Sequence, residues 1–154
     1  MPDQMMITCP LKDELQTCAL GAALAALAGP GDVIALYGDL GAGKTTLTRG
    51  LIRALMRDDE DVPSPTYTLV QVYEGPAFPV WHFDLYRLET PDDLRELGWD
   101  ETQAGLAVIE WPNKAGRFLP EWRLDVTLEF DGDRRQARLE AKGKDWQTRL
   151  NEFR

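Results

Sequence analysis

The sequence contains few of the residues that build zinc sites and disulfide frameworks. Among its 154 residues there are two cysteines, Cys9 and Cys18, and one histidine, His82. The cysteines do not form a C-x-x-C pair, and no second cluster completes a zinc site. We therefore expect neither zinc nor a disulfide, and we interpret both cysteines as reduced packing residues.

Long apolar segments are also missing from the sequence. No run approaches the roughly 18 residues that a membrane helix needs, and Ala19–Ala28 is short and rich in alanine and glycine. The segment Met1–Thr8 has no basic start and no small-residue cleavage site after an apolar stretch, so it does not resemble a signal peptide. These absences predict a soluble, cytoplasmic protein that makes no contact with a membrane.

Positive charge is in deficit. The chain has 17 lysines and arginines against 26 aspartates and glutamates, which gives a net charge of −9. Proteins that bind nucleic acid on their own usually carry a basic face that neutralises phosphates. We therefore expect any role connected with RNA to pass through a partner protein, with tRNA bound only indirectly.

The apolar content is nevertheless sufficient for a folded domain. Hydrophobic residues make up 44% of the chain and charged residues 28%, a composition that can bury a core. The length predicts one domain over residues 1–154. Apolar spacing predicts a helix within Leu11–Ala28, a buried strand at Asp32–Tyr37 and a second amphipathic helix from Gly43.

The rest of the chain continues this alternation and ends in a hairpin. Strands are predicted at Thr66–Tyr73, Pro79–Leu85 and Leu106–Ile109, and a short helix at Pro91–Leu97. Asp131-Gly132-Asp133 separates two alternating segments, Leu124–Phe130 and Arg135–Ala141, which is typical of a β-hairpin. We predict an α/β fold of the P-loop NTPase type, with three layers, a mostly parallel sheet, helices on both faces and an antiparallel C-terminal hairpin.

A phosphate-binding loop is the strongest motif. Gly38–Thr45 fits the pattern G-x-x-x-x-G-K-[ST] at every position, between a predicted strand and a predicted helix. Its glycines let the backbone N–H groups approach phosphate oxygens, and the helix adds its positive N-terminal end. Lys44 is expected to reach the β and γ phosphates, Thr45 to join a Mg²⁺ shell, and Thr46 to contact the α phosphate. The loop predicts binding of ATP with Mg²⁺ through Gly41, Ala42, Gly43, Lys44, Thr45 and Thr46.

Two carboxylates are candidates to complete the site. Glu110 follows the apolar run Leu106–Ile109, and Asp84 follows the strand that begins at Pro79. Hydrolysis needs a second Mg²⁺ partner and a group that positions water. The alternative for Glu110 is an exposed acid at a strand end, and the alternative for Asp84 is a helix cap or an ion-pair partner of Arg87. Thr66 is interpreted as either a γ-phosphate sensor or a turn residue. His82 is interpreted as a strand residue without a catalytic role.

The motifs together resemble one known family. The segment Gly38–Gly50 resembles the P-loop of the bacterial TsaE family. Members of this family are YjeE-type P-loop proteins of tRNA threonylcarbamoyladenosine biosynthesis. Ser64–Val70 resembles the second motif of that family, His82–Leu88 the third, and Glu110–Pro112 the fourth. The four motifs occur in the order of the family, and with the loosely similar N-terminal helix and terminal strands the resemblance covers nearly the whole chain.

The resemblance implies roles for individual residues. It makes Thr45 and Glu110 the pair that binds Mg²⁺, and it gives Asp84 a catalytic part in ATP hydrolysis. It also makes Thr66 a residue of a switch-like segment. Thr17 corresponds to a position that lines the adenine pocket, and Arg135 to a basic position that faces the nucleotide. With Lys44, the implied catalytic set is Asp84, Lys44 and Thr66.

The resemblance also implies a role in a larger assembly. Members of the family work with two related proteins, TsaB and TsaD, in modifying adenosine 37 of tRNAs that read codons starting with A. ATP hydrolysis by this chain, slow without partners, is then expected to reset or gate that assembly. A small-molecule kinase with a P-loop is the alternative function, and a nucleotide-sensing module without enzymatic activity is a third.

Overall fold

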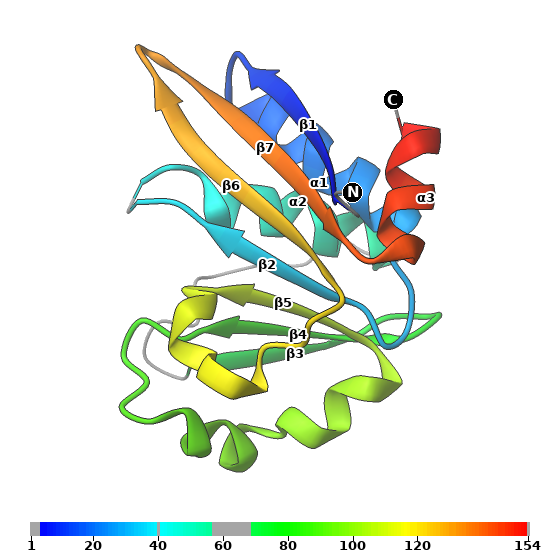
Figure 1. Cartoon of the computed structure of the whole chain (residues 1–154), viewed down its shortest axis with the longest axis vertical. Helices are drawn as coiled ribbons and strands as arrows, with labels where there is room; N and C mark the ends of the chain where they lie inside the picture. Colours follow the sequence, from blue (N-terminus) through cyan, green and yellow to red (C-terminus); the bar gives the residue numbers. More distant parts are fainter. Residues whose placement is uncertain (1–3, 40, 57–68, 154) are drawn as a thin grey trace.

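The computed structural model describes residues 4–39, 41–56 and 69–153, and within them seven strands form one sheet (Figure 1). The order of the strands in space is β1-β7-β6-β2-β5-β4-β3. The strands are β1 (Gln4–Leu11), β2 (Val33–Tyr37), β3 (Val70–Glu74), β4 (Pro79–Asp84), β5 (Leu106–Glu110), β6 (Arg123–Asp131) and β7 (Arg134–Lys142). The helices are α1 (Glu14–Leu27), α2 (Lys44–Leu55) and α3 (Lys144–Phe153), with 3₁₀ helices η1 (Pro91–Leu97), η2 (Trp99–Ala104) and η3 (Pro112–Phe118).

The centre of the sheet is parallel. β6, β2, β5 and β4 are parallel neighbours, whereas β7 is antiparallel to β6, β1 to β7, and β3 to β4. Strands β1, β6, β2, β5 and β4 therefore run in one direction, and β7 and β3 in the opposite one. The predicted α/β class, the parallel centre and the C-terminal hairpin are confirmed, with Gly132 in the hairpin turn at a φ of 62°.

Two elements at the chain ends were not predicted. β1 pairs with β7 along its full length, from Gln4 opposite Lys142 to Leu11 opposite Arg135, and α3 follows β7. The helix predicted within Leu11–Ala28 is confirmed as α1, and Asp13 caps it by accepting a hydrogen bond from the backbone N–H of Gln16.

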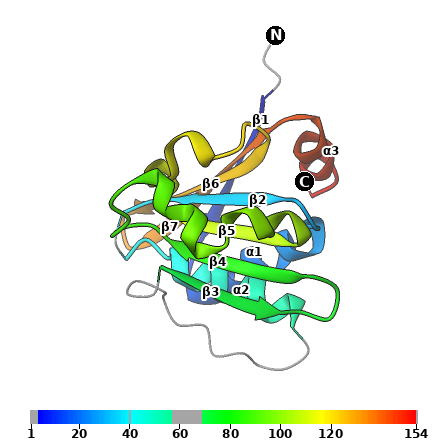
Figure 2. The ribbon, with the colours of Figure 1, turned by 90° about the horizontal axis from the view of Figure 1, so that it is seen from below.

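Helices cover both faces of the sheet, as predicted (Figure 2). One face packs against α1, α2 and α3 through a large apolar cluster that includes Leu24, Leu51 and Ile34. The other face packs against the three 3₁₀ helices through a smaller cluster that includes Phe83 and Leu94. The helix predicted at Pro91–Leu97 has these bounds but is 3₁₀. In the described residues we find no helix whose length and apolar character suit a membrane span.

Helices α1 and α2 approach each other unusually closely. A Cβ atom at Gly21 of α1 would lie 2.1 Å from the carbonyl oxygen of Leu47, and one at Gly50 of α2 would lie 2.2 Å from that of Cys18. Glycine at both positions therefore allows backbone-to-backbone contact. This contact brings Thr17 of α1 next to the start of α2, where the phosphate-binding loop ends.

Candidate nucleotide-binding site

The phosphate-binding loop joins the carboxyl end of β2 to the start of α2. Gly43 caps α2 in the left-handed region at a φ of 108°, and Gly38 and Gly41 also have positive φ values, 144° and 81°. Such backbone conformations favour glycine over residues with a Cβ atom. The loop therefore presents the amino end of α2, with its unpaired N–H groups and positive dipole end, at the edge of the sheet.

Lys44 is buried in the loop, with only 5% of its surface exposed. Its Nζ donates a hydrogen bond to the carbonyl oxygen of Gly38 and lies 3.9 Å from the centroid of the Trp111 ring. Trp111 has a left-handed φ of 59°, an uncommon conformation for a residue other than glycine. Burial lowers the pKa of Lys44, and the carboxylates of Glu110 and Asp84 act in the opposite direction.

The two candidate carboxylates end neighbouring strands. Asp84 is the last residue of β4 and Glu110 the last of β5, and the two are paired in the parallel register. Glu110 is in turn paired with Leu36 of β2, the strand that leads into the loop. Both carboxylates are buried. The sheet therefore brings Asp84 and Glu110 to the edge where Lys44 and Thr45 begin α2.

Thr45 and Glu110 have the chemistry and spacing of a Mg²⁺ site. The Oγ1 atom of Thr45 lies 3.4 Å from Oε2 of Glu110, close to the separation of about 3 Å between adjacent ligands of an octahedral Mg²⁺. Hydroxyl and carboxylate oxygens are the ligands that this cation prefers. Among the described residues there is no cluster of three or more His, Cys, Asp or Glu side chains around a metal position, but Mg²⁺ at a P-loop takes most of its ligands from phosphates and water.

His82 is a residue of this site that the sequence reasoning missed. Its Nε2 atom lies 2.7 Å from Oε2 of Glu110, and its side chain is fully buried. A signal for it exists in the strand pattern: His82 and Asp84 are two residues apart on β4, so their side chains share a face of the sheet. Because β5 is parallel to β4, Glu110 lies on that same face beside them.

A second group of predicted residues lines one cavity beside the loop. The cavity has a volume of about 180 Å³ and lies between the start of α1, the phosphate-binding loop and the tip of the β6–β7 hairpin. Arg135 reaches it from β7, and its Nη2 donates to the carbonyl oxygen of Gly41 at 3.3 Å. Thr17 is buried, and its hydroxyl donates to the carbonyl oxygen of Asp13. The predicted nucleotide contacts in this lining are Thr17, Gly41, Ala42, Gly43, Thr46 and Arg135.

Comparison with known proteins agrees with this arrangement. The family model described as "Threonylcarbamoyl adenosine biosynthesis protein TsaE" matches residues 11–138. This chain belongs to the TsaE family. The protein named tRNA threonylcarbamoyladenosine biosynthesis protein TsaE from Rickettsia bellii is 38% identical over 131 residues, which cover 84% of this chain and 91% of the relative. The protein of the same name from Bacillus subtilis is 40% identical over 120 residues, which cover 77% of this chain and 74% of the relative.

A solved structure is also similar over nearly the whole chain. The crystal structure of YdiB from Bacillus subtilis superimposes with a TM-score of 0.82 at 29% identity, and the match covers 99% of this chain and 96% of that one. This likeness agrees with the single mixed sheet and its helical layers. It supports the P-loop NTPase-like fold predicted for this member of the TsaE family.

The site in this TsaE family member is described except for one predicted part. Thr66 lies outside the described residues, so its switch-like role stays a prediction. The structure brings the other predicted residues to the two sides of the phosphate-binding loop. On one side lie Lys44, Thr45, Asp84 and Glu110, and on the other the cavity with Thr17 and Arg135.

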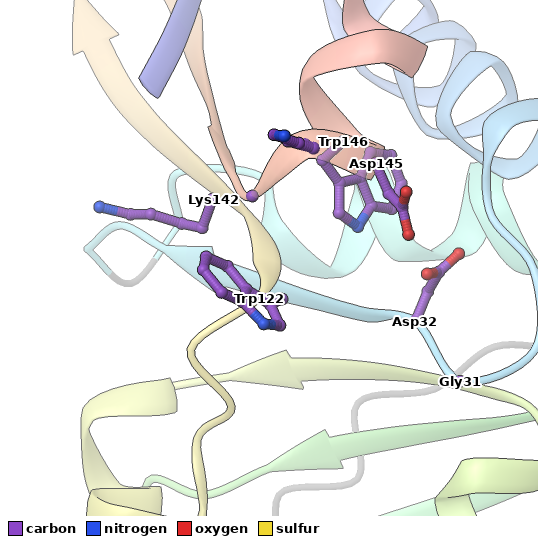
Figure 3. A pocket seen from close by; sticks show the side chains of 8 residues that line it. Gly31, Asp32, Trp122, Lys142, Asp145 and Trp146 are labelled. Carbon is purple, nitrogen blue, oxygen red and sulfur yellow. The ribbon is translucent and has the colours of Figure 1, made fainter. Parts of the chain in front are cut away.

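A larger cavity lies at the opposite end of β2 (Figure 3). Its volume is about 470 Å³. Two of the charged groups beside it are paired within the chain: Lys142 contacts Glu140 at 2.7 Å, and Asp32 contacts Arg149 at 2.5 Å. The candidate nucleotide site of this TsaE family member remains the phosphate-binding loop, where the predicted residues gather. Residues labelled in the larger cavity include Asp32, Trp122, Lys142 and Trp146.

Proposed function

We propose that this member of the TsaE family is a Mg²⁺-dependent ATPase that serves threonylcarbamoyladenosine formation in tRNA. The observation that carries the proposal is the meeting of Lys44 and Thr45 with two buried carboxylates from neighbouring strands. The names of the relatives, tRNA threonylcarbamoyladenosine biosynthesis proteins, support the pathway. The modified residue is adenosine 37 of tRNAs that read codons starting with A, and the chain acts on a complex of TsaB and TsaD.

Binding of ATP is assigned to the loop and the cavity beside it. The N–H groups at the start of α2 contact the phosphates, and Lys44 contacts the β and γ phosphates after its ammonium leaves the carbonyl of Gly38. Thr17 and Arg135 line the cavity that takes the nucleoside. The lining of this cavity includes no described residue from the side of the loop where Glu110 lies. Nucleoside binding is therefore assigned to one side of the loop and phosphate chemistry to the other.

Hydrolysis is assigned to the carboxylate side of the loop. Thr45 and Glu110 would hold Mg²⁺, which would offset the negative charge that develops on the phosphate oxygens. Asp84 is buried beside Glu110. Its carboxylate accepts a hydrogen bond from the attacking water and so orients that water. The water oxygen bonds to the γ phosphorus, the bond to the β–γ bridging oxygen breaks, and ADP, phosphate and a proton are released.

The chain is proposed to act as a switch on its partners. Hydrolysis is expected to be slow in isolation and to change when TsaB and TsaD bind. The net charge of −9 favours this route over direct contact with tRNA. Turnover of ATP then resets or gates the assembly, and the transfer of the threonylcarbamoyl group takes place on the partners.

The test measures phosphate release from ATP by the purified chain, with and without TsaB and TsaD. We expect Lys44→Ala to weaken ATP binding about 10- to 100-fold, because a charge-assisted contact is lost. Lys114→Ala, an exposed lysine on η3, is the matched control. Asp84→Asn and Glu110→Gln are each expected to lower turnover about 100-fold or more.

Three outcomes would overturn the proposal. Unchanged ATP affinity and turnover in Lys44→Ala would remove the nucleotide site. Transfer of labelled γ phosphate to a metabolite and not to water would make the protein a kinase. Fast turnover by the isolated chain that ignores TsaB and TsaD would remove the switch.

A further inference from the structure

We propose that His82 is a positioning residue of the nucleotide site, which holds the Glu110 carboxylate against Thr45 through an Nε2–H hydrogen bond. The inference rests on the proposed function and assigns a role to a residue for which the sequence motifs predict none. His82 acts through Glu110 and does not itself touch ATP or the cation.

The geometry places one carboxylate oxygen between two donors. Oε2 of Glu110 lies 2.7 Å from Nε2 of His82 and 3.4 Å from Oγ1 of Thr45. His82 comes from β4 and Thr45 from the first turn of α2, so the carboxylate at the end of β5 is held from the sheet and from the helix. Both His82 and Glu110 are buried, at 0% and 3% exposure, and rotation of Glu110 away from Thr45 would leave a buried donor without its acceptor.

The hydrogen bond also determines which ring nitrogen carries the hydrogen. An ionised carboxylate only accepts, so Nε2 of His82 must donate. Nδ1 is buried and has no hydrogen-bond partner among residues 4–39, 41–56 and 69–153. A hydrogen on Nδ1 would be a buried donor without an acceptor in this part of the chain, which is costly. The geometry therefore favours donation from Nε2 to Glu110.

Histidine at this position does more than fill space. The apolar residues that precede and follow it on β4 fill the core, and Val80 lies on the same face two residues earlier, fully buried in the large cluster. His82 is the position on this face where a side-chain N–H reaches Glu110. Residues that orient a metal-binding side chain in this way typically change metal affinity 10- to 100-fold when replaced.

The first experiment measures ADP binding by calorimetry over a range of Mg²⁺ concentrations. We expect His82→Asn to raise the Mg²⁺ concentration needed for half of the metal-dependent gain in ADP affinity by about tenfold. ADP affinity without Mg²⁺ is expected to stay within about twofold, because the loop and Lys44 are intact. His82→Gln, whose amide nitrogen reaches the place of Nε2, is expected to recover most of the lost Mg²⁺ response.

Two controls separate positioning from packing. Val80→Ala removes buried volume from the same face of β4 and is expected to lower thermal stability without changing the Mg²⁺ response. In a Glu110→Gln background, His82→Asn is expected to have no further effect on that response, because the carboxylate through which His82 acts is absent.

A second measurement uses only the wild-type protein, so it does not depend on whether a variant folds. His82 is the only histidine of the chain, so a long-range ¹H–¹⁵N spectrum of the wild-type protein reports its ring without assignment of other residues. We expect hydrogen on Nε2 and none on Nδ1.

The outcomes distinguish the two proposals. If wild-type protein shows no Mg²⁺-dependent gain in ADP affinity, the proposed function fails. If the gain is present but His82→Asn leaves it unchanged, or if the ring carries its hydrogen on Nδ1, the positioning role of His82 is wrong while the proposed function stands.

Discussion

Replacement of Gly50 by alanine tests the close contact that aligns α1 with the phosphate-binding loop. A Cβ atom there would lie 2.2 Å from the carbonyl oxygen of Cys18 and 2.8 Å from its carbonyl carbon, whereas ordinary contact begins at 3.4 Å. Both are backbone atoms, so no rotamer change relieves the overlap. The two helices would have to separate by about 1 Å, which weakens dispersion contacts along the whole interface.

Two opposing effects set the magnitude. Overpacking in a tight interior costs about 1–3 kcal/mol, and a rigid backbone neighbour favours the upper end of that range. Alanine inside a helix is about 1 kcal/mol more favourable than glycine. We therefore expect a net loss of about 2 kcal/mol in the free energy of unfolding for Gly50→Ala, and a melting temperature lower by about 4–8 °C for a chain of this size.

Thermal and urea unfolding followed by circular dichroism measure this difference. Gly29→Ala is the matched control, because the nearest atom to a Cβ at Gly29 is 3.9 Å away, and its stability is expected to change by less than about 1 kcal/mol. Gly50→Ala is also expected to weaken ATP binding, since α2 carries Lys44 and Thr45. A Gly50→Ala protein more stable than wild type by about 1 kcal/mol, as helix propensity alone dictates, would refute the close-packing argument.

Three further predictions follow from other parts of the structure. Arg135→Ala removes the contact to the Gly41 carbonyl and a positive charge beside the cavity, and should weaken ATP binding about tenfold in calorimetry with little change in melting temperature. Burial raises the pKa of Asp125, although its hydrogen bond to Arg123 opposes the shift. The folded state therefore binds that proton more tightly than the unfolded state, and the contribution of Asp125 to stability falls as the pH rises through its folded pKa. Asp125→Asn does not titrate and should accordingly gain stability relative to wild type as the pH rises above the ordinary pKa of an aspartate, measured by urea unfolding. Finally, the isolated chain should bind tRNA weakly at physiological salt in a filter-binding assay, because its net charge is −9.

Each of these has a contrary result. Equal ATP affinity in Arg135→Ala would remove Arg135 from the nucleotide site. A stability difference between Asp125→Asn and wild type that stays constant with pH would contradict the raised pKa. Tight tRNA binding by the chain alone would mean that a basic face exists despite the negative net charge.

Local signals in the sequence predicted several parts of the fold. The phosphate-binding loop Gly38–Thr45 needs glycine at positive φ and a lysine at the helix start, and these demands concern adjacent residues. The hairpin around Gly132 and the short helix Pro91–Leu97 are local for the same reason. β1 was not predicted, because its role depends on pairing with β7 at the other end of the chain.

The sequence by itself predicted a phosphate-binding loop, because the requirements of that motif lie within eight consecutive residues. It left open whether Glu110 was an exposed acid at a strand end and whether Asp84 was a helix cap or ion-pair partner. Only the tertiary structure shows that both carboxylates are buried beside the loop, since the parallel pairing of β4 and β5 next to β2 places them there. The contact between His82 and Glu110 spans 28 positions of the chain, and no local pattern contains it. Strand order and register, which arise from long-range packing, therefore completed the site that the loop begins.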